Sequence, residues 1–319
     1  MSKLSIPEKL LSISSDDEFD AQARETFAHQ LQHNAVFNEF VRGIKSKTWQ
    51  ESFIPIELFK SHRVSCHATE ESIFKSSGTS SSQRSQHFVH DLSLYRKLSI
   101  AHFESLYGAL NDLVILALLP SYQDQGDSSL VWMVDQFVQS SSRHSQFVGA
   151  DFESLQRLIR DQVKSEKVLL LGVSYALLDF AENHSIDHPN LSIMETGGMK
   201  GRREEITREE LHRRIRLSFP TSEISSEYGM TELLSQAYLM DGQFVAPPWV
   251  RVFATNVSDP LEILEPGRRG ILAFADLANY HSCSFIQTQD IGGVDNSGRF
   301  TVEGRLDHSD IRGCNLLYT

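Results

Sequence analysis

The chain has 319 residues, of which 40% are hydrophobic and 9% aromatic, so it is long enough to bury a sizeable core in one large domain or two modest ones. Its net charge of -12 argues against a nucleic-acid backbone or an anionic membrane surface as the main partner. Three cysteines stand far apart without metal-ligand spacing, the first residues lack the pattern of a signal peptide, and the longest apolar run is too short for a membrane span. These features predict a globular protein of the reducing cytoplasm.

The first 50 residues predict helices, because hydrophobic residues recur three and four positions apart among charged ones. These residues are Phe19, Ala23, Phe27 and Leu31, followed by Phe37, Phe40 and Val41. The sequence then continues through a loop with Pro55 and a short amphipathic piece, residues 56–60.

A serine-rich loop lies between two short β-prone segments, residues 73–74 and 87–89. It contains Ser76, Ser77, Gly78, Thr79, Ser80, Ser81 and Ser82. Such a loop offers backbone N–H and side-chain O–H groups to an anion, and Arg84 adds a positive charge. The alternative is a flexible serine linker, although a linker is not expected to join one strand directly to another. The rest of the chain decides between the two interpretations.

Residues from about 113 to 240 alternate strand and helix. Apolar runs typical of buried strands are residues 113–119, 168–171 and 191–194, and a further short strand is predicted at 223–227. Amphipathic patterns predict helices at residues 91–106, 128–139, 152–163 and 175–182. The clearest helix start is Thr207, which forms a capping box with Glu210. This alternation predicts a mostly parallel sheet with helices on both faces.

From residue 244 the pattern changes to short strands separated by Gly, Pro and Asn turns. The predicted strands are residues 249–253, 270–274, 284–288 and 299–302. We therefore predict an α/β chain in two parts: residues 1–240 form an α/β region, and residues 241–319 form a β-rich end piece.

Several loops are expected at the ligand-binding edge of the predicted sheet, because ligands on parallel sheets bind beyond the carboxyl ends of the strands. They are residues 196–198, residues 228–232 and the turn after Leu171. Tyr228 offers a flat ring for a base, and Glu232 offers a hard oxygen ligand for Mg²⁺. Taken singly, Tyr228 also fits a core aromatic and Glu232 a solvated helix start.

Four short motifs, in this order, resemble those of the adenylate-forming enzymes (acyl-CoA synthetases, luciferases and relatives). They are Ser76-Ser-Gly-Thr79, Tyr228-Gly-Met-Thr-Glu232, Thr288-Gln-Asp290 and Gly304-Arg-Leu-Asp307. The sequence is more closely similar to the acyl-protein synthetase (LuxE-type) branch, in which residues 54–60 and 309–315 also have counterparts. The resemblance runs from about residue 27 to the last residue. It implies the large domain of these enzymes, with layered, mostly parallel sheets flanked by helices, and a β-rich subdomain at 241–319 that completes the nucleotide site.

The resemblance implies ATP- and Mg²⁺-dependent activation of a carboxylic acid, of the fatty class, as an acyl adenylate. The carboxylate attacks the α-phosphorus of ATP and pyrophosphate leaves. The main demands of this step are positioning and charge neutralisation, which loops, a metal ion and an arginine can meet. The acyl group would then pass to a thiol on a protein, and a partner protein is one source of that thiol.

The implied ATP-binding residues of the serine loop are Ser76, Ser77, Gly78, Thr79 and Ser80. Those of the later loops are Gly197, Gly198, Tyr228, Gly229, Met230, Thr231, Asp290 and Arg305. In this assignment Tyr228 stacks on adenine, Asp290 accepts hydrogen bonds from the ribose hydroxyls, and Arg305 clamps the nucleotide. The residues assigned to catalysis are Thr79, Arg84, Thr231 and Glu232, and Glu232 is the ligand of Mg²⁺.

The acyl pocket implied by the resemblance is bordered by Gly172, Ser174 and Tyr175. Cys283 and Cys314 are the thiols nearest the nucleotide motifs, and either could accept an acyl group. A buried structural cysteine is the alternative for each.

The sequence departs from the family pattern at several positions. The serine-rich loop of the family commonly ends in lysine, whereas Arg84 is the nearest cation here, and Gln289 stands where glycine is usual. Relatives continue beyond the counterpart of Gly313 into a small C-terminal domain with a catalytic lysine, and we expect this domain to be absent. Two alternatives follow: transfer to CoA or another small acceptor, and a nucleotide or acyl-AMP binding module with little turnover.

A serine hydrolase is a third alternative. Residues 172–176, Gly-Val-Ser-Tyr-Ala, come close to the G-x-S-x-G turn of α/β-hydrolases. Ser174 would be the nucleophile, with Asp290 as the acid and His308 as the base. The structural alternative is that the small residues Gly172 and Ala176 only allow a tight turn from strand to helix.

Overall fold

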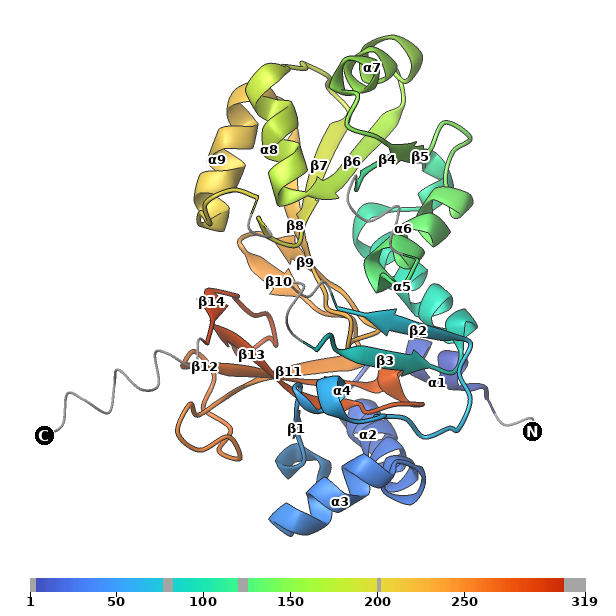
Figure 1. The fold of residues 1–319 in the computed structure, drawn as a ribbon, viewed down its shortest axis with the longest axis vertical. Coiled ribbons are helices and arrows are strands. Elements are labelled where there is room, and N and C mark those ends of the chain that lie inside the picture. Colours follow the sequence, from blue (N-terminus) through green and yellow to red (C-terminus); the bar gives the residue numbers. More distant parts are fainter. Residues whose placement is uncertain (1–3, 77–82, 120–125, 200–201, 307–319) are drawn as a thin grey trace, which may run out of the picture. The chain divides into compact units, whose positions relative to one another are not determined.

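The protein is represented by a computed structural model that describes residues 4–76, 83–119, 126–199 and 202–306. The chain forms two compact units (Figure 1). Unit 1 comprises Met1–Tyr95, Glu232–Ser235 and Asp241–Thr319, and unit 2 comprises Arg96–Thr231 and Gln236–Met240.

Unit 2 is built on six neighbouring strands of a seven-stranded sheet, in the order β9-β8-β7-β6-β4-β5. Its strands are β4 (Leu113–Leu118), β5 (Gln146–Val148), β6 (Lys167–Val173), β7 (Leu191–Thr196), β8 (Glu223–Tyr228) and β9 (Ala237–Met240). Neighbours from β5 to β8 run parallel, and β9 is antiparallel to β8. The predicted, mostly parallel sheet is confirmed.

Helices cover both faces of this sheet, with α8 and α9 on one face and α6 on the other (Figure 1). The helices of unit 2 are η2 (Leu110–Asp112), α6 (Ser129–Ser140), α7 (Phe152–Arg157), η3 (Leu158–Gln162), α8 (Ser174–Asn183) and α9 (Arg208–Ser218), and α5 (Leu92–Tyr107) belongs mostly to this unit. Helix α6 connects β4 to the edge strand β5, whereas α8 and α9 connect β6 to β7 and β7 to β8, which is the opposite direction across the sheet. Because such crossovers are right-handed, the two directions place the helices on opposite faces of the sheet. The predicted helix at residues 152–163 ends in a π-helical turn.

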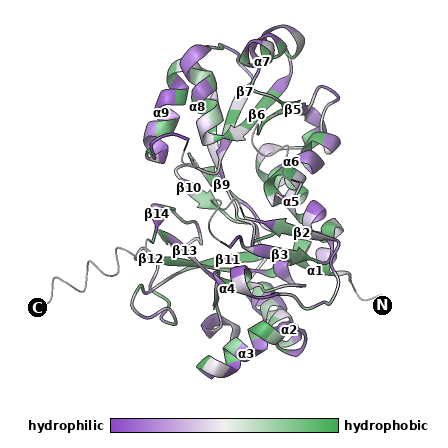
Figure 2. Ribbon diagram, in the orientation of Figure 1, coloured by the Kyte–Doolittle hydropathy of each residue, from purple (hydrophilic) through white to green (hydrophobic). Residues whose placement is uncertain are grey.

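The local sequence explains these elements. All but the first residue of β4 and of β6 are buried, as expected for continuous apolar runs. Helix α9, in contrast, is largely hydrophilic (Figure 2). It begins at the predicted place, because the Thr207 hydroxyl accepts a 3.2 Å hydrogen bond from the Glu210 amide.

Unit 1 contains a mixed sheet with the order β1-β13-β12-β11, with β14 on β13, and a separate hairpin of β2 and β3. The strands of this sheet and hairpin are β1 (Ile54–Pro55), β2 (Ser72–Lys75), β3 (Gln86–Val89), β11 (Val250–Thr255), β12 (Arg269–Asp276), β13 (Phe285–Gly293) and β14 (Gly304–Arg305). Strand β10 (Gln243–Val245), the edge strand of the seven-stranded sheet, also falls within unit 1. The helices of unit 1 are α1 (Ile6–Leu11), α2 (Asp16–His33), α3 (Ala35–Ile44), η1 (Trp49–Glu51), α4 (Leu58–Ser61) and η4 (Leu277–Asn279). The strand predicted at 299–302 does not form, because Phe300 makes only isolated bridges with Phe244 and Val294.

The N-terminal helices share a core with the C-terminal sheet. The rings of Phe27, Phe37 and Trp49 have centroids 5.7 to 6.0 Å from the ring of Phe285 in β13. Strand β1 also pairs in parallel with β13. The structure therefore divides the chain differently from the predicted parts 1–240 and 241–319: residues 1–95 belong to the same unit as the end piece. The hydrophobic face of the N-terminal helices was evident in the sequence, but its partner lies far away along the chain.

Among the described helices, none is both long enough and apolar enough to cross a membrane.

Candidate functional site

The base of the serine-rich loop is a closed hairpin in unit 1. Strands β2 and β3 pair antiparallel from Ser72–Val89 to Lys75–Gln86. Beyond them the Ser76 amide donates to the Ser85 carbonyl (3.1 Å), and the Ser85 amide donates to the Ser76 hydroxyl (3.0 Å). The predicted strands on both sides of the loop are confirmed. Ser77, Gly78, Thr79 and Ser80 lie outside the described residues.

Arg84 helps to hold this base together. Its guanidinium donates to the Ser76 carbonyl and to the Lys75 carbonyl, the latter at 3.1 Å. The cation that follows the serine loop is thus anchored by backbone carbonyls on the opposite side of the hairpin. Its catalytic role stays a prediction.

The segment Glu232–Ser235 is fixed by two polar side chains at the end of β12 and in η4. Asn279 donates to the Glu232 carbonyl (2.7 Å) and accepts from the Leu234 amide (3.0 Å). Asp276 accepts from the amide and the hydroxyl of Ser235 at 2.9 and 2.7 Å. Burial raises the pKa of Asp276 to about 6, although the bonds from Ser235 oppose the rise. Because each partner is buried, this segment has a defined backbone position.

The Glu232 carboxyl meets the base of the serine hairpin. Its side chain is buried, with 5% of the residue exposed, and the Ser85 hydroxyl donates a hydrogen bond to it. Burial raises the pKa of Glu232, while the Ser85 bond and the charges of Arg305 and Lys60 act in the opposite direction. Two motifs that are far apart in the sequence therefore come together within unit 1.

Asp290 and Arg305 are cross-strand neighbours in β13 and β14. Arg305 Nε lies 3.9 Å from Asp290 Oδ1, and the Arg305 side chain is 66% exposed. Next to Asp290, the Gln289 amide group donates to the Glu57 carboxylate. Unit 1 thus contains three of the predicted site residues: Arg305 is paired with Asp290 and its charge lowers the pKa of Glu232.

In unit 2 the predicted loops gather at one edge of the sheet. The carboxyl ends of β6, β7 and β8 are in register, with Val173 opposite Thr196 and Thr196 opposite Glu227. Ser174, the turn at Gly197 and Gly198, and Tyr228 therefore share this edge, as the sequence predicted. Gly197 has φ +69°, a left-handed conformation that glycine adopts most easily.

Ser174 is held by polar partners on the neighbouring strand. Its hydroxyl lies 2.9 Å from Glu195 Oε2 and 3.0 Å from the Gly197 carbonyl oxygen, and it can donate to either. Neither partner is a histidine, and His308 lies outside the described residues. A side chain on Gly172 would place its Cβ 2.9 Å from Leu177 Cγ and 3.2 Å from Leu118 Cβ. The geometry thus favours a tight strand-to-helix turn over a hydrolase nucleophile.

Tyr175, predicted at the acyl pocket, is buried, and the Arg202 guanidinium lies 4.8 Å above its ring. Burial raises the pKa of the Tyr175 hydroxyl. Its role in acyl binding stays a prediction.

Cys283 is buried, with no exposed surface, and its thiol faces the Phe285 carbonyl at 3.6 Å. Burial raises the pKa of this thiol, which disfavours the reactive thiolate. Its position favours the structural role that the sequence also allowed. Cys314 lies outside the described residues.

Sequence reasoning missed two acidic residues at the carboxyl edge in unit 2, Glu195 and Glu227, and it assigned no role to Thr196, the first residue of a predicted loop. Both glutamates are buried, with 5% and 7% of their surface exposed. Burial raises the pKa of Glu227 to about 7, and the charge of Glu195 raises it further against the Thr196 hydrogen bond. The available signal was a carboxylate at the end of a predicted strand, beside a predicted loop.

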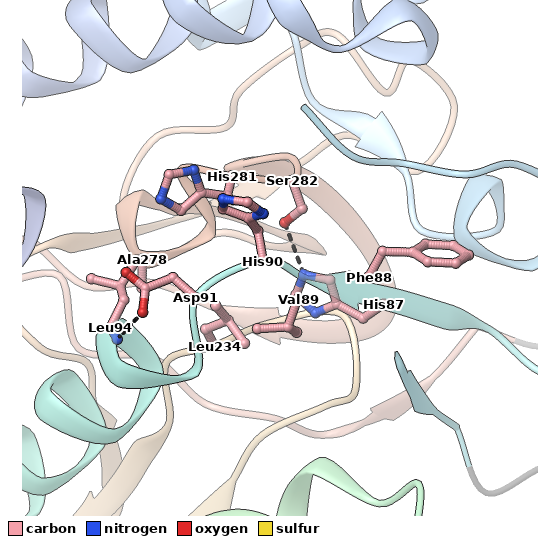
Figure 3. Close-up of a pocket in the computed structure, with 10 residues that line it drawn as sticks. All are labelled: His87, Phe88, Val89, His90, Asp91, Leu94, Leu234, Ala278, His281 and Ser282. Atoms are coloured by element: carbon pink, nitrogen blue, oxygen red, sulfur yellow. Dashed lines mark hydrogen bonds between the residues drawn. The ribbon is translucent and has the colours of Figure 1, made fainter. Parts of the chain in front are cut away.

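A pocket in unit 1 borders the segment that carries Glu232 (Figure 3). It is lined by His87, Phe88, Val89, His90, Asp91, Leu94, Leu234, Ala278, His281 and Ser282. His87 Nε2 and the Ser282 hydroxyl are hydrogen-bonded at 2.8 Å across it. This histidine-rich pocket was not predictable from the sequence, because its members come from distant segments.

Histidines behind the pocket contact one another directly. His67 Nε2 and His281 Nδ1 are 2.9 Å apart, and the rings of His67 and His90 stack with centroids at 3.6 Å. Burial, together with the charges of the neighbouring histidines, lowers the pKa of His281 to about 4. In the part of the chain that the structure describes, no group of three or more His, Cys, Asp or Glu side chains is arranged to hold a metal ion.

The fold of the chain matches that of the large domain of adenylate-forming enzymes. An open conformation of 2-hydroxyisobutyryl-CoA ligase, in complex with 2-HIB-AMP and CoA, matches with a TM-score of 0.68 and 10% identity over 92% of this chain and 70% of that chain. ATP-bound MatB from Rhodopseudomonas palustris matches with a TM-score of 0.56 and 16% identity over 73% of this chain and 47% of that chain. The luciferase-like enzyme from the nonluminescent Zophobas morio mealworm matches with a TM-score of 0.51 and 16% identity over 74% of this chain and 57% of that chain.

The match thus spans about half the length of MatB. No protein-family model matches the sequence, and no curated protein matches it. At identities this low, the structural matches establish the fold alone. An activity has to be argued from the residues of the candidate site.

Proposed function

We propose that the protein activates a carboxylic acid as an acyl adenylate at the expense of ATP. The observation that carries this proposal is the contact of Glu232 with Ser85, because it brings the acidic residue of one predicted nucleotide motif to the base of the hairpin that holds another. Arg305 connects Asp290 with Glu232, because it forms an ion pair with Asp290 and its charge lowers the pKa of Glu232. The fold shared with ATP-bound and acyl-AMP-bound ligases supports the same conclusion.

In unit 1 the serine loop would hold the phosphates of ATP, with Ser76 at the base of the hairpin and Ser77, Gly78, Thr79 and Ser80 in the loop. Arg84 would add positive charge to this loop. Asp290 would accept hydrogen bonds from the ribose hydroxyls, because a carboxylate has acceptors for both. Arg305 is exposed and donates from a planar fork, which suits an anionic nucleotide.

Glu232 fits the Mg²⁺ ion that accompanies ATP. Mg²⁺ in nucleotide sites commonly binds one or two protein carboxylates and completes its shell with waters and substrate phosphates. The buried Glu232 carboxylate can supply one such protein ligand. When bound, the ion would neutralise phosphate charge. Ser85 would orient the carboxylate toward it.

In unit 2 the carboxyl edge of the sheet would contact the nucleoside and the reacting phosphorus. The bare backbone of Gly197 and Gly198 allows close approach of the adenine, and Tyr228 offers a ring face for stacking. Gly229 and Met230 continue this loop to Thr231, whose hydroxyl would contact the α-phosphate. Gly172, Ser174 and Tyr175 would border the acid.

The reaction needs no covalent intermediate on the protein for its first step. The carboxylate oxygen of the substrate forms a bond to the α-phosphorus, and the bond to the bridging oxygen of pyrophosphate breaks. Positioning and charge neutralisation supply most of the catalysis in such transfers. A fatty acid is the proposed substrate and a protein thiol the proposed acceptor, as in the acyl-protein synthetase branch.

Carboxylate-dependent exchange between ATP and pyrophosphate tests this function. We expect the unmodified chain to catalyse exchange with one or more acids of a panel from acetate to long-chain fatty acids, and Ser174→Ala to retain it. Binding of ATP without exchange for any acid would instead support a nucleotide-binding module. Ester hydrolysis that is lost in Ser174→Ala would support the hydrolase.

The acceptor is tested by intact mass after incubation with ATP and an active acid. An acyl adduct that disappears in Cys283→Ser or Cys314→Ser would identify an acceptor on this chain. Exchange activity without an adduct on any cysteine would exclude self-acylation, and the acceptor would then be sought among CoA and partner thiols.

A further inference from the structure

One buried side chain links the two turns of unit 2 that are proposed to contact the nucleoside. Thr196 ends β7 and directly precedes Gly197, and Glu227 is the residue before Tyr228 in β8. The two residues are paired in register on neighbouring parallel strands. The Thr196 hydroxyl donates a hydrogen bond to Glu227 Oε2. This bond joins the last residue before one turn to the strand that leads into the other.

The second carboxyl oxygen of Glu227 touches the other turn. A Cβ atom on Gly229 would lie 2.5 Å from Glu227 Oε1 and 3.5 Å from Gln236 Cγ. The carboxyl cannot swing into solvent to make room, because the residue is 7% exposed and its other oxygen is held by Thr196. Gly229 is therefore required by the position of Glu227, and the turn at 228–230 packs directly on this carboxyl group.

The placement of Glu227 is costly, which argues for a purpose other than packing. Its carboxyl is buried beside a second acid, Glu195, whose own charge faces Arg208 Nε at 3.7 Å and His212 Nε2 at 3.8 Å across the sheet face. Two carboxyl groups in a buried site destabilise each other when both are ionised. An apolar side chain would fill the same position without this penalty.

We propose that Glu227 is a positioning residue for nucleotide binding, in that its carboxyl group fixes the turn at Gly197 and Gly198 relative to the turn at Tyr228 and Gly229. This inference rests on the proposed function. In the proposed site, adenine stacks on Tyr228 in one turn and is approached by the backbone of Gly197 in the other, so the distance between the two turns has to stay constant. The side-chain link between the ends of β7 and β8 keeps this distance constant. Glu227 itself touches no nucleotide in this arrangement. Loss of the link raises the entropy that ATP binding must remove, so affinity falls.

The test is a double-mutant cycle on the ATP dissociation constant, measured by calorimetry with MgCl₂. We expect Glu227→Ala and Thr196→Val each to weaken ATP binding about tenfold, as coupling energies of contacting residues allow. The double variant is expected to bind about as weakly as either single variant, because both changes remove the same link. Glu227→Gln keeps the shape and one acceptor and is expected to restore most of the affinity. Glu223→Gln, an exposed acid at the other end of β8, is the control and should bind like the unmodified chain.

A split in the exchange assay separates positioning from general damage. The KM for ATP should rise in Glu227→Ala while the KM for the acid stays unchanged, whereas a globally weakened fold would change both. Unchanged ATP affinity in Glu227→Ala, or additive effects of the two substitutions, would overturn the role of Glu227 alone. Absence of ATP binding by the unmodified chain would overturn the proposed function and this inference together.

Discussion

The Ser85 hydroxyl donates a hydrogen bond to the buried carboxyl of Glu232, joining two segments that are far apart in the sequence. Ser85 closes the hairpin of β2 and β3, and Glu232 is held from behind by Asn279. The base of the serine hairpin and an acidic residue are thereby placed together. This is the arrangement expected of a site for a phosphate chain and its metal ion.

Removal of this hydroxyl should weaken the fold of unit 1. Ser85→Ala leaves a buried carboxyl without its donor, and we expect a loss of about 1–3 kcal/mol in the free energy of unfolding. Urea denaturation at neutral pH measures the loss. Ser72→Ala in strand β2 of the same hairpin is the control, with an expected change within about 0.5 kcal/mol. Equal effects of the two substitutions would show that the Ser85 bond contributes nothing.

Glu227 should make the protein less stable as pH rises. Its pKa is about 7 in the folded protein, against 4.5 for the exposed group, so between these values the folded state binds more protons than the unfolded state. Stability from this group is full below about pH 4.5 and falls as pH rises toward 7, by up to about 3 kcal/mol. The free energy of unfolding is measured by denaturation at pH 5 and pH 8. From pH 5 to pH 8 the unmodified chain should lose more stability than Glu227→Gln, which cannot ionise at this position. Parallel stability at both pH values would contradict the shift.

His281 should have the opposite effect in unit 1. Its pKa is lowered to about 4 by burial, by the charges of His67, His90 and His29 and against that of Asp91, so the unfolded state binds more protons between about pH 4 and 6.5. Stability should therefore fall as pH drops through this range, by about 1–3 kcal/mol. His281→Asn retains an acceptor for His67 and should reduce this loss. The exposed His62→Asn is the control, and a loss as large in His281→Asn as in the control would contradict the prediction.

Gly172 should not tolerate a side chain. The Cβ of Gly172→Ala would lie 2.9 Å from Leu177 Cγ in the turn from β6 to α8, and such overpacking typically costs about 1–3 kcal/mol. Gly149→Ala is the matched control, because nothing lies within 4 Å of its added Cβ. Thermal unfolding measures both. Equal melting temperatures would show that the turn has room that the structure does not reveal.

The sequence predicted the α/β fold of unit 2 well, because local patterns determine it. The apolar runs that became β4, β6 and β7 and the capping box at Thr207 are signals within a few residues. The contribution of the N-terminal helices to the C-terminal sheet was not predictable in this way. Packing of Phe37 on Phe285 depends on a contact between distant parts of the chain, which periodicity does not encode.

The candidate site shows the same contrast. Motifs with a characteristic residue pattern, such as the loop that ends at Glu232, were recognised from the sequence. Ser85 was not, because it lies in a serine-rich segment and nothing in the sequence distinguishes it from its neighbours. Glu227 stood inside a predicted strand, and its burial and its bond with Thr196 appear only when β7 and β8 pair. The motif residues were recognisable from local sequence, whereas Ser85 and Glu227 are distinguished only by their tertiary contacts.

The most direct test of the central claim compares ATP–pyrophosphate exchange in Glu232→Gln and Glu223→Gln under the same acid and MgCl₂ concentrations. Loss of a metal-binding carboxylate should lower exchange by about a hundredfold or more in Glu232→Gln, while Glu223→Gln should match the unmodified chain. Folding of both variants is checked by circular dichroism. Exchange by a folded Glu232→Gln at the rate of the unmodified chain would contradict a nucleotide site built on Glu232 and the serine hairpin.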